Sequence, residues 1–354
     1  MSTLRTNAIL DASGGTTATV NGIPLRPGVL DPENRIINGA FDFWQRGTSF
    51  TASAYGADRW YNAVASGGTV TQSRQAFTPG ETFSGNNPTY FLRQSVTGTT
   101  APSHYAITMQ MMESVRSYAG QTITVLGWAR RSSGSGNMAV ELEQDFGTGG
   151  SPSAAVYVPG QTVTLTGSWA PFAVTFSVPS ISGKTLGSNN NDYLRLTFWT
   201  SAGSAYNART NSLGLQTIGV DLWGIHIKQG THTTSAVDLY RQPELGPELA
   251  RCQRYYERFG PNTYIGIGMA WETNAARAVV NYTPKRGTPT FTSNEVVVYK
   301  ATSSGVIMTS PSFDLPKSTT VLIYGSASMS ATAGQAIQVL TNNPSGFLAV
   351  DAEL

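Results

Sequence analysis

Charge and reactive side chains are scarce in this 354-residue chain. Charged residues make up 12% of it, about half of the share of about 25% that is usual in soluble proteins. The single cysteine, Cys252, excludes an intrachain disulfide framework and a zinc site built on cysteines. The three histidines, His104, His226 and His232, lack the spacing of metal ligands. The sequence therefore offers little for redox or zinc chemistry.

Basic clusters and long hydrophobic runs are also missing. The net charge is +2, and no more than two basic residues are adjacent, which disfavours a nucleic-acid partner. No apolar run has the length of about 20 residues that a membrane-spanning helix needs. Residues 1–7 lack the apolar core of a secretory signal. We expect a soluble protein that is made in the cytoplasm, with no nucleic-acid partner and no membrane insertion.

Catalytic motifs are incomplete. Gly183-Lys184-Thr185 resembles the end of a phosphate-binding loop, but Val178 stands where that loop needs glycine. No Gly-x-Ser-x-Gly turn supports a serine nucleophile. Glu141 and Glu143 share one face of one predicted strand, whereas glycosidases flank the scissile bond with two carboxylates. Such a same-strand pair is more typical of a solvated face, so we expect no enzymatic activity.

Turn-forming and strand-forming patterns dominate instead. Apolar residues alternate with polar ones over residues 122–130, 138–146, 172–178 and 193–199, between loops rich in Gly, Ser and Asn. This period of two indicates antiparallel sheets stacked face to face. Residues 34–245 have the size of one sandwich or jelly roll. Residues 261–354 return to the same patterning after a predicted helix over 246–260, which begins near Pro247 and stops at Gly260.

Residues 1–33 form a separate, turn-rich leader. Its apolar residues recur at intervals between polar residues and glycines: Leu4, Ile9, Val20, Ile23 and Leu25. Such a stretch cannot bury a core alone, so it is either a flexible tail or an arm that orders against a partner, and the recurrence favours the arm. The predicted fold is all-β: a jelly-roll β-sandwich with an extended N-terminal arm, a short connecting helix and a second C-terminal β domain.

One set of residues lies on the non-core side of its strands and suits sugar binding. Exposed aromatic rings stack on sugar rings, and neighbouring carboxylates and guanidinium groups hydrogen-bond hydroxyls. The alternative is that loops or a neighbouring subunit bury the two tryptophans, and a shift of one residue in the pattern would invert the set. The predicted glycan-binding residues are Trp128, Arg130, Glu141, Glu143, Tyr193, Arg195 and Trp199.

The stretch Ile36-Ile-Asn-Gly-Ala-Phe-Asp-Phe-Trp-Gln-Arg-Gly47, followed by Ala57-Asp-Arg-Trp60, marks the start of the β region. We call it the opening motif. We place Trp44 and Trp60 in the core, and Arg46 and Asp58 form either a semi-buried pair or two separate surface charges. If the first and last strands are neighbours, Asp42 and Asp221 supply hard oxygen ligands for a structural Ca²⁺; otherwise Asp42 caps a turn.

The opening motif resembles the start of a module common in tail-fibre and related virion proteins of bacteriophages and prophages. The resemblance covers about residues 34–259 and continues through Gly120-Gln-Thr-Ile-Thr-Val-Leu-Gly-Trp-Ala-Arg130, Gly219-Val-Asp-Leu-Trp-Gly224 and Glu248-Leu-Ala-Arg-Cys-Gln-Arg-Tyr-Tyr-Glu257. It implies a jelly roll similar to carbohydrate-binding modules, in which acids at the places of Asp42 and Asp221 often hold structural Ca²⁺. The segment Val220-Asp-Leu-Trp-Gly224 departs from the paired acid usual there.

The resemblance also implies a particle context. The leader resembles the N-terminal arms that dock phage fibres, so residues 1–33 are expected to bind other virion proteins. The expected protein is a non-enzymatic, homotrimeric appendage on the virion surface, made in the host cytoplasm, that adsorbs to bacterial surface polysaccharide. Two alternatives stay open: a structural head-fibre, decoration or collar protein that binds only virion proteins, and a polysaccharide depolymerase.

Overall fold

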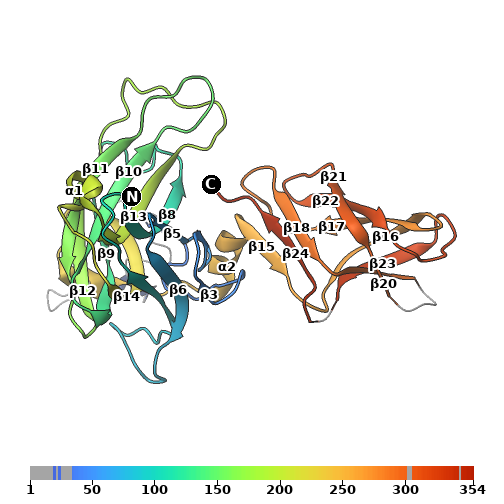
Figure 1. Cartoon of the computed structure of the whole chain (residues 1–354), viewed down its shortest axis with the longest axis horizontal. Helices are drawn as coiled ribbons and strands as arrows, with labels where there is room; N and C mark the ends of the chain where they lie inside the picture. Colours follow the sequence, from blue (N-terminus) through green and yellow to red (C-terminus); the bar gives the residue numbers. More distant parts are fainter. Residues whose placement is uncertain (1–18, 21–22, 25–33, 301–304, 343) are drawn as a thin grey trace.

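The computed structural model describes residues 19–20, 23–24, 34–300, 305–342 and 344–354. Two β-sandwiches of unequal size lie on either side of helix α2 (Leu245–Gln253), as Figure 1 shows. Within the leader, β1 (Thr19–Val20) and β2 (Ile23–Pro24) pair as a hairpin that places Val20 opposite Ile23. The other predicted arm residues, Leu4, Ile9 and Leu25, lie outside the described residues. In the described part of the chain, no helix is long and apolar enough to cross a membrane.

The larger sandwich consists of two six-stranded antiparallel sheets. The first, called the β10 sheet, has the order β11 (Val156–Thr164), β10 (Asn137–Asp145), β13 (Tyr193–Ala202), β8 (Tyr105–Glu113), β5 (Tyr61–Ala65), β4 (Ala54–Tyr55). The second, called the β9 sheet, has the order β12 (Ala170–Ser177), β9 (Thr122–Gly134), β14 (Ile218–Gln229), β7 (Tyr90–Thr97), β6 (Thr69–Ala76), β3 (Ser49–Phe50). From β7 on, the chain crosses repeatedly between the sheets, as in a jelly roll. The predicted fold class is confirmed.

The core of this sandwich lies between the two sheets and follows the predicted alternation. Val125 of β9 and Leu142 of β10 point inward, and so do Leu196 and Phe198 of β13. Phe41, Trp44 and Trp60 of the opening motif pack into the same core, so the core placement predicted for the two tryptophans is confirmed. Because inward positions alternate with outward ones, the polar residues between them face away from the core.

The opening motif is held by a turn at Asn38 and Gly39. Asn38 has a φ of 56°, and its side-chain nitrogen donates to the carbonyl oxygens of Phe43 and Asp58 at 2.9 and 3.1 Å. A Cβ on Gly39 would lie 2.0 Å from the carbonyl oxygen of Ile225 in β14, so only glycine fits there. The turn thereby fixes the motif against the last strand of the sandwich.

The connecting segment departs from the predicted helix over 246–260. Helix α2 ends at Gln253, and β15 (Tyr256–Phe259) follows it. Two residues of β15 that were assigned to the helix, Tyr256 and Glu257, pair with Asp351 and Val350 of β24 (Phe347–Asp351). The backbone hydrogen bonds of this ladder replace those of a further helical turn.

The smaller sandwich packs a three-stranded sheet against a seven-stranded one. The three-stranded sheet has the order β15, β24, β18 (Thr290–Asn294). The seven-stranded sheet has the order β20 (Val306–Ile307), β19 (Val296–Lys300), β23 (Ala336–Thr341), β16 (Tyr264–Glu272), β17 (Ala275–Asn281), β22 (Thr320–Ser326), β21 (Thr309–Asp314). Ile265, Val280 and Ile323 of the larger sheet are among the residues that form its core.

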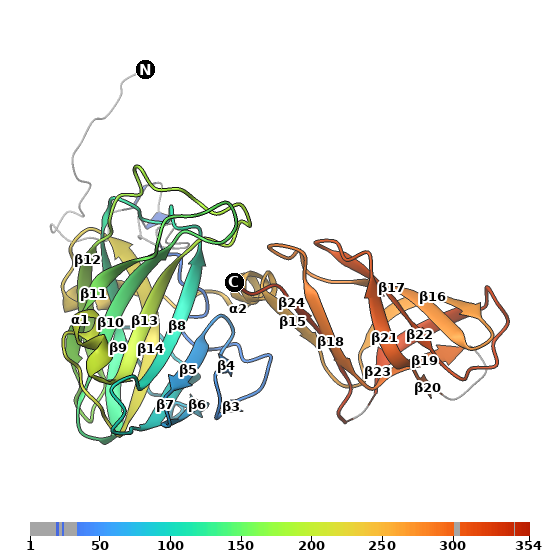
Figure 2. The ribbon, with the colours of Figure 1, turned by 45° about the horizontal axis from the view of Figure 1, so that its top comes forward.

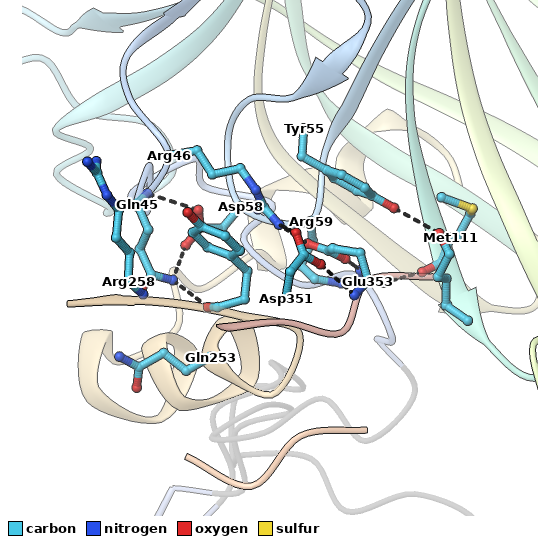
Figure 3. Close-up of polar contacts among 12 residues, drawn as sticks. Gln45, Arg46, Tyr55, Asp58, Arg59, Met111, Gln253, Arg258, Asp351 and Glu353 are labelled. Atoms are coloured by element: carbon cyan, nitrogen blue, oxygen red, sulfur yellow. Dashed lines mark hydrogen bonds and ion pairs between the residues drawn. The ribbon is translucent and has the colours of Figure 1, made fainter. Parts of the chain in front are cut away.

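Charged residues of the opening motif join the two sandwiches (Figure 3). Arg46 forms an ion pair of 3.1 Å with Asp351, and its guanidinium carbon lies 3.4 Å from the centroid of the Tyr256 ring. Arg59 is 1% exposed and forms an ion pair with Glu353. The predicted pair of Arg46 with Asp58 is not the one formed, because the Asp58 carboxylate accepts hydrogen bonds from Gln45 at 2.9 and 2.6 Å.

Candidate functional site

The seven predicted glycan-binding residues do not share one face. All of them point away from the sandwich core, as their alternation predicts, but they lie on two different sheets. Trp128 and Arg130 lie on the outer face of the β9 sheet, and the other five lie on the outer face of the β10 sheet. Outward side chains of two stacked sheets point in opposite directions. The prediction of a single binding face is therefore wrong.

On the outer face of the β9 sheet, other side chains bury Trp128. Trp128 is 4% exposed, and its ring lies 5.1 Å from Trp223 and 6.0 Å from both Phe83 and Tyr240. The 3-10 helix η2 (Thr234–Leu239) also packs on this face. The predicted exposure of Trp128 is wrong, and the alternative of burial by loops is correct. The aromatic members of the cluster are Phe77, Phe83, Phe91, Trp128, Trp169, Trp223 and Tyr240.

Trp199 on the opposite side is also buried, at 2% exposure. Tyr206 of the 3-10 helix η1 (Ser204–Tyr206) lies 5.2 Å from its ring, and Tyr105 of β8 lies 6.2 Å away. The indole nitrogen donates to Glu141 at 3.0 Å. Residues of η1 therefore cover Trp199, and its ring is not accessible to a ligand.

The carboxylates on the β10 sheet belong to an ionic network. Arg209, from the short helix α1 (Asn207–Thr210), donates to Glu141 from Nε at 2.6 Å and from Nη2 at 2.8 Å. It also lies 3.4 Å from Glu143, which Arg195 contacts from the neighbouring strand. Burial raises the pKa of Glu143 above its ordinary value, against the effect of Arg195 and Arg209. Sequence patterning did not identify Arg209, because α1 is a single turn inside a loop.

Two polar atoms beside this network have no protein partner in the described part of the chain. They are Nε of Arg195 and Oγ1 of Thr197, both shielded from solvent. Thr197 lies opposite Glu141 in the strand register, and Arg195 lies opposite Glu143. Buried polar groups are nearly always hydrogen-bonded, so an internal ordered water is the partner that suits these two atoms, which a surface ligand does not reach.

Tyr157 is the aromatic ring that this face presents to solvent. It is 46% exposed, and it lies opposite Glu143 in the pairing of β10 with β11. The guanidinium carbon of Arg209 lies 3.8 Å from the centroid of its ring. Figure 2 shows β11, β10, β13 and β8 side by side, with α1 against the β11 side of the sheet. We call Tyr157, Glu143, Arg195, Thr197 and Arg209 the Tyr157 face.

Tyr193 lies at the end of the same face. It pairs with Asp145 on β10 and is half-buried. Burial raises the pKa of Tyr193 to about 12, although the neighbouring Arg195 lowers it. The phenol therefore keeps its proton at neutral pH and can donate a hydrogen bond. Tyr157 was not among the predicted glycan-binding residues. Four residues that were predicted do lie together on this face: Glu141, Glu143, Tyr193 and Arg195.

The two aspartates expected to bind Ca²⁺ have other partners. Asp221 is fully buried and accepts from Arg93 at 2.6 and 2.8 Å and from Arg130 at 2.7 Å. Asp42 accepts from Gln242 at 2.8 Å, and burial raises the pKa of Asp42 to about 6. Among the described residues, no group of three or more potential metal ligands occurs. Two arginines on one carboxylate do not fit a calcium site, so this prediction is wrong.

No protein-family model matches the chain, and no curated protein matches it. Among solved structures, it is similar to the enzymatically active domain of bacteriophage CBA120 tailspike protein 4, with 11% identity and a TM-score of 0.33, over 56% of this chain and 21% of that one. It is also similar to a CBM4 structure, with 16% identity and a TM-score of 0.30, over 55% and 98% of the two chains. A third similar structure is the family 11 carbohydrate-binding module from Clostridium thermocellum in complex with a β-1,3-1,4-mixed-linked tetrasaccharide, with 10% identity and a TM-score of 0.31, over 51% and 95%. The all-β sandwich is established by the strands and sheets described above.

Proposed function

We propose that this chain is a non-enzymatic virion appendage protein that adsorbs to bacterial surface polysaccharide through the Tyr157 face. The observation that carries the proposal is the exposed Tyr157 ring beside an ionic network in which the Arg195 and Arg209 side chains are partly exposed. Ligand sites typically combine an apolar surface with a few fixed polar groups. This face has both features on one sheet.

The chemistry of the face suits a neutral or hydroxyl-rich sugar. A sugar ring stacks its apolar C–H face on Tyr157, which Arg209 holds from the other side at 3.8 Å. The ring hydroxyls then accept from the guanidinium groups of Arg195 and Arg209, whose side chains are partly exposed. The carboxylate of Glu143 accepts from a further hydroxyl, and charge-assisted hydrogen bonds of this kind are the stronger ones.

The same geometry supports binding without hydrolysis. Glu141 and Glu143 come from one strand, and both are paired with arginine. A glycosidase needs one carboxyl group on each side of the scissile bond, and one of the two must act as a general acid. Carboxylates held by guanidinium groups on one side of a bound sugar cannot take both places. Release of reducing ends from capsular polysaccharide by the purified protein would show that the depolymerase alternative is correct.

We also propose that the protein acts on a virus particle, because its opening motif and its leader resemble segments of phage proteins. Residues 1–33 dock the protein to other virion proteins, and the assembled appendage is a homotrimer on the particle surface. Several copies allow weak sugar contacts to add up to firm adhesion. Trp128 and Trp199 are buried within one chain, so neither offers an aromatic surface to a sugar. The Tyr157 face is therefore the feature that favours glycan binding over a purely structural role.

A bacterial glycan array, probed with the full-length protein and with Tyr157→Ala, tests the proposal. We expect retention of at least one surface polysaccharide by the wild type and a loss of about tenfold or more in the variant, because stacking on the ring is removed. Leu215→Ala serves as the matched control, since Leu215 is also exposed and lies in the loop before β14. If the wild type retains no glycan, or if Tyr157→Ala binds like the wild type, the Tyr157 face is not a glycan site.

A further inference from the structure

The outer face of the seven-stranded sheet in the smaller sandwich is apolar and open to solvent. Ile267 is 72% exposed, and Val279, its neighbour in the register, is also exposed. Met269 and Trp271 follow on the same side of β16. Ala270, between Met269 and Trp271, packs into the core on the opposite side of the strand, and the register shift between Tyr264 and Gly266 places Ile265 in the core as well. Large contiguous apolar patches of this kind mark interaction sites on soluble proteins.

The composition of this face is typical of the centre of a protein interface. The guanidinium carbon of Arg277 lies 4.0 Å from the centroid of Trp271 and 5.3 Å from that of Tyr324. Interface centres are enriched in Trp, Tyr, Met and Arg and depleted in carboxylates. In the register, Ile267 lies between Val279 and Gln338, and Met269 lies between Arg277 and Ala336, so none of its direct neighbours is a carboxylate. A groove of about 720 Å³ runs beside Ile267 and Met269 toward Tyr299.

The size of the face matches one side of a stable interface. Seven strands give six spacings of about 4.8 Å, or about 29 Å across the sheet. The longer strands, with six to nine residues at about 3.3 Å each, give about 20–30 Å along it. The product, about 600–850 Å², is the footprint of the whole sheet with its polar positions included, and a standard interface buries about 800 Å² of each partner.

We propose that this face packs against a second copy of this chain. An apolar face of this extent is complementary to itself, so two copies bury it without any need for matching charges. Stacked sheets approach to about 10 Å, a distance at which Ile267, Met269 and Val279 interdigitate with their counterparts. Two copies that stack face to face through this contact form a dimer, and three copies that surround a threefold axis with it form the homotrimer proposed above. The inference does not depend on the proposed glycan binding, because the Tyr157 face lies on the other sandwich.

Sedimentation equilibrium of the full-length protein between about 1 and 100 µM tests the contact. We expect the wild type to have the mass of two or three chains. The dissociation constant of the Ile267→Asp oligomer should be at least tenfold higher than that of the wild type, because a buried unpaired carboxylate opposes the contact. Leu315→Asp is the matched control: Leu315 is 73% exposed, but it lies in the turn after β21, off the face. It should associate like the wild type.

Two further measurements keep the test decisive. Far-UV circular dichroism and thermal melting establish that each variant is folded, and Val279→Lys on the neighbouring strand should dissociate the oligomer as Ile267→Asp does. A wild type that is monomeric at 100 µM overturns the proposal, and so does a folded Ile267→Asp that keeps the wild-type mass. Glycan retention by monomeric Ile267→Asp at high glycan density separates this outcome from failure of the Tyr157 face.

Discussion

Replacing Thr197 by valine should stabilise the protein and leave glycan binding unchanged. The Thr197 hydroxyl is fully buried and has no hydrogen-bond partner among the described residues. Burying a hydroxyl without a partner costs about 1–3 kcal/mol, and valine has nearly the same shape. We therefore expect a gain of about 1 kcal/mol, which corresponds to about 2–4 °C in Tm for a sandwich of this size. Because the hydroxyl is shielded from the surface, glycan affinity should stay at the wild-type value.

Thr200→Val is the matched control on the same strand. Thr200 is buried to the same degree, but its hydroxyl donates to Gln94 at 2.6 Å and to the carbonyl oxygen of Ala106 at 3.1 Å. The same substitution there should cost about 1–3 kcal/mol, because it leaves buried acceptors unpaired. Calorimetry and glycan titration measure both variants. If Thr197→Val is as destabilising as Thr200→Val, the Thr197 hydroxyl has a partner in the folded protein and this reasoning is refuted.

Three further substitutions test the charged groups. Arg209→Ala leaves the fully buried Glu141 without its cation and should cost about 3–5 kcal/mol in urea unfolding. Glu353→Gln removes the carboxylate that pairs with buried Arg59 and should lower the free energy of unfolding by a similar amount. Because the pKa of Asp42 is raised from 3.8 to about 6, the folded protein holds a proton between about pH 4 and 6 that the unfolded chain releases. Stability should therefore fall by up to about 3 kcal/mol as pH rises through that window, and Asp42→Asn should make the slope shallower by the contribution of this one carboxyl group.

Each of these substitutions has a matched comparison. Arg209→Lys keeps the charge but not the two parallel hydrogen bonds, so it should recover only part of the loss. Asp351→Asn removes the more exposed partner of Arg46 and should cost about 1 kcal/mol or less. A wild type and Asp42→Asn with equal pH slopes between pH 4 and 6 would contradict the assignment to Asp42.

Local patterning predicted which side chains face the core but not which outward faces coincide. The alternation of β9 and β10 places Val125 and Leu142 inward, because a period of two is a property of a single strand. Whether Trp128 and Trp199 share a face depends on which sheet each strand joins, and that is a long-range property. Tyr157 was not identified because Pro159 and Gly160 interrupt the alternation of β11.

The error at the connecting helix has the same origin. The spacing of Leu249 and Cys252 indicates a helix, and α2 does cover these residues. Tyr256 and Phe259 continue that spacing in the sequence, but they lie in β15, paired with a strand about 90 residues further along. The hydrogen bonds of that ladder are made with a distant segment, and a prediction from local sequence propensity does not include them. The helix therefore ends where a distant strand supplies the better set of hydrogen bonds.

The opening motif is part of the core of the larger sandwich, and it also connects the two sandwiches. Its aromatic residues, Phe41 and Trp60, pack inward, while Arg46 and Arg59 reach the C-terminal segment. Arg59 meets a carboxylate 294 residues away, and a buried guanidinium without such a partner is costly. The larger sandwich therefore reaches its full stability only when the C-terminal segment docks. This coupling fixes the Tyr157 face relative to the apolar face of the smaller sandwich, so the proposed oligomer would also set the orientation of the proposed sugar-binding faces.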